Sequence, residues 1–147
     1  MSLKQLNTLY KFEKDKEQKA ANLLQQAEAD YQQNVVRLQS VGDYRLEYLK
    51  RLSDRSATGI DSATYSHFHG FISKLDYATE QVKIALNQAK ALVEKRKQQW
   101  FQQQQKVQAV ELLREKQLLK QQQKAQKQEQ KMFDEIATQQ FVRRNLK

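Results

Sequence analysis

A stretch of about eighty residues, from about Ser62 to about Gln140, contains no proline and repeats its seam positions at alternating steps of three and four. The average step of 3.5 residues is typical of a left-handed coiled coil. At ~1.5 Å per residue such a helix would be about 120 Å long, more than a small globular domain spans, so the pattern predicts an elongated rod. The predicted seam consists of Phe68, Ile72, Leu75, Thr79, Val82, Leu86, Ala89, Val93, Arg96, Trp100, Gln103, Val107 and Val110.

The composition also favours long helices. The 147 residues include no proline, no cysteine and only three glycines, and 29% of them are charged, which leaves few places to turn the chain and little material for a round core. Without cysteine the chain has no disulfide and no thiolate metal site. This is compatible with a reducing compartment and favours the cytoplasm.

The first half of the chain carries a heptad register of its own. Most of its fifteen positions are apolar, but Glu13, Glu17, Asn34 and Arg45 interrupt the apolar pattern. Polar seam residues usually fix the register of a helix pair at a cost in stability. We therefore expect these four residues to be structural. The register consists of Leu3, Leu6, Tyr10, Glu13, Glu17, Ala20, Leu24, Ala27, Tyr31, Asn34, Leu38, Val41, Arg45, Tyr48 and Leu52.

The only cluster of turn-forming residues lies between the two registers, from Ser53 to Ser62. Gly59 can adopt positive φ, and Asp61 or Ser62 can cap the next helix. A helix with one apolar stripe needs a partner, so the two registers should pair. The predicted fold is all-α, an antiparallel two-helix coiled-coil hairpin in a single domain, with helix one at about 3–53, a turn at about 54–61, helix two at about 62–140 and a tail at 141–147.

The two registers predict which residues lie side by side. With Leu52 near Tyr65, Tyr48 should lie level with Phe68, Val41 with Leu75, and Leu3 near residue 113. Helix two should therefore overhang its partner by about thirty residues, and residues 117–131 of this overhang are rich in Gln and Lys.

An apolar stripe returns near the end of the overhang, with Asp134 and Glu135 to its side. An exposed stripe of this kind favours a partner surface, the alternative being association with a second copy. The stripe consists of Met132, Phe133, Ile136 and Ala137.

Near the turn the apolar stripe is wider than a two-stranded coil requires. We interpret it as a docking site, the alternative being an aromatic layer that closes the hairpin. Gly42 and Gly70 lie at the same level, which predicts a bend or a close approach of the helices, because glycine inside a helix costs about 1 kcal/mol relative to alanine. The candidate site consists of Val41, Tyr44, Tyr48, Phe71, Leu75 and Ala78, with Val82 beside it.

Catalytic and metal chemistry have little support in the sequence. A two-helix hairpin offers no enclosed pocket, and there is no glycine-rich phosphate loop or nucleophile elbow. His67 and His69 are the only histidines, and at a spacing of two they point away from each other on a helix. We expect no catalytic residue, no metal site and no cofactor.

The net charge of +9 favours an acidic partner, which includes nucleic acid, anionic lipid and acidic protein. The basic residues are interleaved with acids, as in residues 13–17, and we interpret them as scattered and not gathered into a stripe with stacking aromatics. The densest run is Lys95–Lys97. The sequence therefore predicts no nucleic-acid partner.

The sequence predicts neither a signal peptide nor a membrane-spanning helix. Residues 1–5 lack the apolar core of a signal peptide, and no stretch approaches the ~20 apolar residues that span a bilayer. We expect a chain that is neither exported by that route nor inserted directly into a membrane.

Three segments together resemble the FliJ family of flagellar type III export proteins. They are Asp43-Tyr44-Arg45-Leu46-Glu47-Tyr48, the turn Gly59-Ile60 with the following Tyr65, Phe68, Phe71, Ile72 and Leu75, and the terminal Lys131-Met132-Phe133-Asp134-Glu135-Ile136-Ala137. The resemblance covers nearly the full length in size, turn position and charge.

This resemblance implies a non-enzymatic stalk that inserts into the hexameric flagellar export ATPase, contacts the export-gate membrane protein and helps to cycle export chaperones. It implies a cytoplasmic protein, peripheral on the inner membrane through the export apparatus. The gate-facing surface would match Val41, Tyr44, Tyr48, Phe71, Leu75 and Ala78. The ATPase would be met by the paired helices away from the turn and by the overhang. The remaining hypotheses are a generic coiled-coil adaptor or oligomerisation rod and a basic hairpin that binds nucleic acid.

Overall fold

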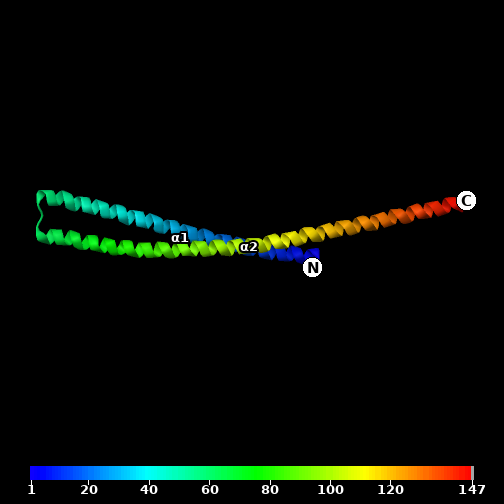
Figure 1. Ribbon diagram of the computed structural model, residues 1–147, viewed down its shortest axis with the longest axis horizontal. Helices are drawn as coiled ribbons and strands as arrows, with labels where there is room; N and C mark the ends of the chain where they lie inside the picture. The colour runs from blue at the N-terminus through cyan, green and yellow to red at the C-terminus, as the bar shows by residue number, and fades with distance from the viewer. Residues whose placement is uncertain (147) are drawn as a thin grey trace. The chain divides into compact units, whose positions relative to one another are not determined.

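A computed structural model describes residues 1–146 and shows two α-helices without strands in that range. Helix α1 spans Leu3–Thr58 (56 residues) and helix α2 spans Ser62–Asn145 (84 residues). The helices run antiparallel on either side of a short turn (Figure 1). The predicted all-α class and helical hairpin are confirmed.

Both helices continue beyond their predicted ends. Helix α1 ends at Thr58 instead of about 53, so the turn is confined to residues 59–61. The Ser, Asp and Thr residues before Gly59 are weak helix formers but do not stop a helix. The Thr58 hydroxyl donates to the Arg55 carbonyl at 3.0 Å. Helix α2 passes residue 140 because no breaker follows, and Arg143 and Arg144 in its last turn suit the negative end of the helix dipole. Of the predicted tail, Lys147 lies outside the described residues.

Each helix begins with a capping residue. Ser2 and Gln5 form a capping box, because the Gln5 N–H donates to Ser2 Oγ at 3.2 Å and the Ser2 N–H donates to Gln5 Oε1 at 3.0 Å. Asp61 Oδ1 accepts the Thr64 N–H at 2.8 Å, which caps α2. Gly59 has a φ of +88°, so the predicted roles of Gly59 and Asp61 in the turn are confirmed.

The paired helices divide into two compact units. One unit contains residues 19–101, including the turn, and the other combines residues 1–18 with residues 102–146. Each unit contains one segment from each helix. The single coiled-coil domain stays a prediction.

In the turn unit every predicted seam position is buried or half-buried. The most buried seam residues are Ala27, Asn34, Phe68, Ile72, Ala89 and Val93. The Asn34 side chain donates to the Asp30 carbonyl at 3.0 Å, so its amide is satisfied within α1. Tyr65, expected opposite Leu52, is exposed, at 46%.

In the unit that contains the termini, the seam combines apolar and polar contacts. Leu6, Val107 and Val110 are buried, and the Gln103 amide donates to the Glu13 carbonyl at 3.0 Å. Arg114 Nε donates to Asn7 Oδ1 at 2.8 Å, and Leu3 lines a shallow groove with Glu111 and Arg114, in agreement with the prediction that Leu3 lies near residue 113. Beyond Gln117 every described residue is exposed, and we call residues 118–146 the overhang.

The expected close approach of the helices at Gly42 and Gly70 is wrong. A Cβ added to either glycine would meet no atom within 4 Å, apart from its own local helix backbone, and neither residue has positive φ. Both glycines are helical and carry the usual entropic cost without a packing gain inside the hairpin.

Alanine substitutions distinguish the two helical glycines from Gly59, which lies in the turn. Gly42→Ala and Gly70→Ala should each raise the free energy of unfolding by about 1 kcal/mol, because alanine is the better helix former and has room. Gly59→Ala should lower it by about 1–2 kcal/mol, because φ +88° is unfavourable for an L side chain. Urea unfolding followed by circular dichroism measures all three. A loss of stability in Gly42→Ala would contradict the open space at this position.

The cap of α2 predicts a pH dependence. Hydrogen bonds from Thr64, through its side chain and then its backbone N–H, lower the pKa of the Asp61 carboxyl. Because the folded pKa is the lower one, the stabilisation is present above the unfolded pKa of about 3.9 and is lost as pH falls through the folded pKa. Melting temperatures should therefore drop less between about pH 5 and pH 2 in Asp61→Asn, which keeps a neutral acceptor, than in the natural chain. Equal losses would contradict a contribution from this carboxylate.

Candidate partner-binding surfaces

Four aromatic rings lie together near the turn, and we call them the aromatic cluster. Tyr44 and Tyr48 come from α1, and Phe68 and Phe71 come from α2. The Tyr48 ring lies 4.4 Å from the Phe71 ring and 5.0 Å from the Phe68 ring, measured between centroids. Tyr44 lies edge-on to Phe71 at 6.0 Å. These separations allow favourable ring contacts in addition to the burial of area.

The cluster has a buried side and an accessible side. Phe68 is 6% exposed and belongs to the seam, whereas Tyr44 is 49% exposed. Tyr48 and Phe71 are half-buried between them. The cluster therefore closes the hairpin and also leaves aromatic surface available to a partner, so the two alternatives raised by the sequence are compatible.

The structure brings the predicted site residues together only in part. Tyr44, Tyr48 and Phe71 meet through ring contacts, while Val41, Leu75 and Ala78 are half-buried at seam spacing beside them. Phe68 was predicted to lie level with Tyr48, and their ring contact agrees with this, but Phe68 was left out of the predicted site. The spacing of Phe68 and Phe71, one helical turn apart, was the available signal.

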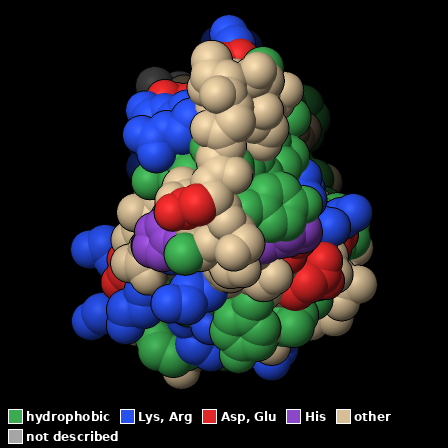
Figure 2. All heavy atoms as spheres, turned by 90° about the vertical axis from the view of Figure 1, so that its left-hand side faces the viewer, with side chains coloured by type: hydrophobic (Ala, Val, Ile, Leu, Met, Phe, Trp, Pro, Cys, Tyr) green, Lys and Arg blue, Asp and Glu red, His purple; other side chains and the backbone are tan. Residues whose placement is uncertain are grey.

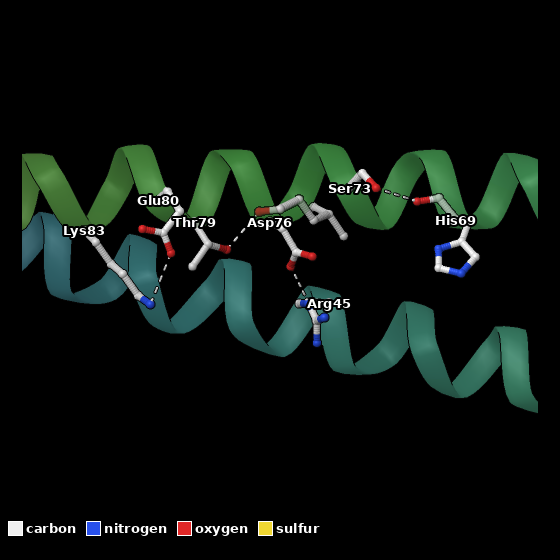
Figure 3. A network of polar contacts seen from close by, with 8 residues as sticks. Arg45, His69, Ser73, Asp76, Thr79, Glu80 and Lys83 are labelled. Atoms are coloured by element: carbon white, nitrogen blue, oxygen red, sulfur yellow. Dashed lines mark hydrogen bonds and ion pairs between the residues drawn. The ribbon is translucent and has the colours of Figure 1, made fainter.

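Two ion pairs lie close to the cluster, and the Arg55 guanidinium carbon lies 5.5 Å from the Phe68 ring centroid. Arg45 of α1 reaches across to Asp76 of α2, with Nε and Oδ1 2.6 Å apart (Figure 3). Arg51 pairs with Glu47 on its own helix at 3.0 Å. Both pairs are exposed to solvent, so each contributes at most about 1 kcal/mol.

The turn end also carries both histidines, shown in purple in Figure 2. The His69 ring packs edge-on against Tyr65 at 5.2 Å, while His67 lines a shallow groove with Thr64 and Phe68. Across residues 1–146 no group of three or more His, Cys, Asp or Glu side chains is placed to hold a metal ion. The histidines thus serve different local contacts.

All four side chains of the predicted apolar stripe at the end of α2 are exposed to solvent. Met132 is 62% exposed, Phe133 63% and Ile136 45%, and Ala137 is exposed as well. The apolar residues Leu118, Leu119, Phe141 and Val142 are also exposed on the overhang and were not included in the predicted surface. No described part of α1 covers these side chains.

No helix within residues 1–146 is long and apolar enough to cross a membrane. The described features define a class of protein, a coiled-coil helical hairpin with an aromatic surface at the turn and an unpaired helical extension.

The comparisons with known proteins identify the family. The family described as "FliJ: Flagellar FliJ protein" matches residues 1–146, so the chain belongs to the FliJ family. It is 28% identical over 125 residues to the flagellar FliJ protein of Salmonella typhi and 29% identical over 125 residues to that of Escherichia coli K12. Both alignments cover 85% of this chain and 85% of the relative. No solved structure matches the chain.

Proposed function

We propose that the chain is a non-enzymatic component of flagellar type III protein export. In this role it inserts into the hexameric export ATPase as a stalk, links the ATPase to the export-gate membrane protein and helps to cycle export chaperones. Membership of the FliJ family supports the flagellar export role. The stalk, the gate contact and the chaperone contact are what the resemblance implies, and we assign the first two to the surfaces described above.

The overhang is the observation that carries the proposal. Residues 118–146 are helical almost throughout, but they bury no seam against α1. An unpaired amphipathic helix that keeps Met132, Phe133 and Ile136 in solvent gains stability when a partner covers it. The ATPase supplies this cover in our proposal.

The aromatic cluster supplies the second contact. Tyr44 is the accessible ring, and Phe71 and Tyr48 support it from below. Aromatic side chains dominate the energetic centres of interfaces. We assign this surface to the export gate, which would hold the protein peripherally at the cytoplasmic face of the inner membrane.

The stalk assignment is tested with the purified export ATPase of the same organism. Adding the full chain should raise the rate of ATP hydrolysis, because the stalk favours the assembled ring. Met132→Gln combined with Ile136→Gln should lose most of this stimulation, since both substitutions keep helix propensity and remove exposed apolar surface. An unchanged rate and an unchanged ring population on adding the natural chain would overturn the stalk assignment.

The gate assignment is tested in cells. Tyr48→Ala combined with Phe71→Ala should abolish swimming in soft agar while far-UV circular dichroism stays helical, because the variant loses both supports of the accessible ring. Tyr77→Ala is the matched control, since Tyr77 is 69% exposed on α2 and lies outside the cluster, and it should swim normally. Normal swimming of the double variant would remove the docking role of the aromatic cluster.

A further inference from the structure

Five lysines in α2 follow a helical spacing that the sequence analysis overlooked. They are separated by steps of four, four, three and four, and α2 is continuous through all of them. At 3.6 residues per turn these steps place the five side chains on one face, within an arc of about 80°. We call this face the lysine ladder; it consists of Lys116, Lys120, Lys124, Lys127 and Lys131.

The interpretation that the basic residues are scattered around the helices is therefore wrong for the segment from Lys116 to Lys131. Between Lys116 and Lys131 the only acid is Glu129, and its position two residues from Lys127 and from Lys131 puts it on the opposite face. No run of basic letters marks the ladder, because two or three other residues, mostly glutamines, separate its successive members.

No described ion pair neutralises the ladder. All five lysines are exposed, and the ion pairs of residues 1–146 join Lys14 to Glu17, Arg45 to Asp76, Arg51 to Glu47, Lys83 to Glu80 and Lys97 to Glu94. The ladder covers about 22 Å along the helix, at 1.5 Å per residue. Such a row of like charges repels itself until an anionic surface lies against it.

The neighbours of the ladder indicate the kind of anion. Gln117 and Gln128 flank it on one side, Gln123 and Gln130 on the other, and Gln123, Gln130, Lys127 and Lys131 share a shallow groove. Residues 116–131 contain no arginine and no aromatic residue, so this segment offers nothing on which bases could stack. An interfacial membrane helix needs apolar residues beside its basic face, and the flanks here are amides.

We infer that the lysine ladder docks an acidic protein surface with carboxylates spread along a length of about 22 Å. The charge of the ladder attracts the carboxylates, and the flanking amides offer further hydrogen bonds. The inference deepens the proposed function, on which it rests only for the identity of the partner as the export ATPase.

The test compares two variants of equal charge. One replaces all five ladder lysines with glutamine, and the other replaces five exposed lysines elsewhere in the same way, so each changes the net charge from +9 to +4. Glutamine preserves helix propensity, and circular dichroism confirms folding. The control positions are Lys11, Lys19, Lys50, Lys74 and Lys90.

The first probe is immobilised poly-L-glutamate of about 20 residues, a length that covers the ladder when helical. The ladder variant should bind about tenfold or more weakly than the control variant, and rising salt should reduce the difference, because several weak exposed pairs are lost together. Equal binding by the two variants would overturn the ladder as a specific surface. A loss confined to single-stranded DNA, or to vesicles of phosphatidylglycerol, would overturn the assignment to a protein partner.

The second probe is the purified export ATPase. If it binds the natural chain and the control variant but not the ladder variant, the ladder and the proposed function both gain support. If it binds all three equally, the ladder assignment is wrong and the stalk assignment stands. If it binds none of them while poly-L-glutamate still distinguishes the variants, the stalk assignment fails and the ladder stands with a different acidic partner.

Discussion

The covering of a single apolar seam on each helix is the interaction on which the rest of the structure depends. A long helix with one apolar stripe is marginal in water until another helix lies against that stripe. Every predicted seam residue of both helices is buried or half-buried where α1 and α2 are paired. The cover stops at the N-terminus of α1, and the chain beyond Gln117 is left with side chains that only another molecule can bury.

Polar contacts between the helices add to the restriction that the three-residue turn places on their alignment. Apolar pairs alone would tolerate a slip of one heptad, because Val, Leu and Ala contacts repeat along both helices. The Gln103 amide meets the Glu13 carbonyl, and Arg114 both donates to Asn7 and lies 4.3 Å from the Tyr10 ring centroid. A slip would break these contacts and leave the buried Gln103 amide without this partner, at a cost of about 1–3 kcal/mol.

The sequence predicted features that depend on periodicity and missed those that depend on local competition. The seam and the cap by Asp61 follow from spacing and residue type. The end of α1 at Thr58 could not be predicted in this way. Ser, Asp and Thr are weak helix formers, but they end a helix only where their side-chain hydrogen bonds compete successfully with those of the helix backbone. The partner positions of Tyr48 and Phe68 followed from register, but the 49% exposure of Tyr44 depends on how the ring packs and required the structure. The close approach of the helices at Gly42 and Gly70 was predicted wrongly, because the sequence shows the cost of a glycine to helix stability and not the space around it.

The two candidate surfaces would bind by different physical means. Beside the aromatic cluster, Asp76 and Glu47 pair with Arg45 and Arg51, so a partner there gains mainly from burying rings. The lysine ladder has no such pairing and gains from long-range attraction, which salt screens within about 10 Å. A chain that keeps these contributions on separate segments can bind an apolar partner firmly and an acidic partner reversibly. One helical hairpin thereby offers two contacts that respond differently to their surroundings.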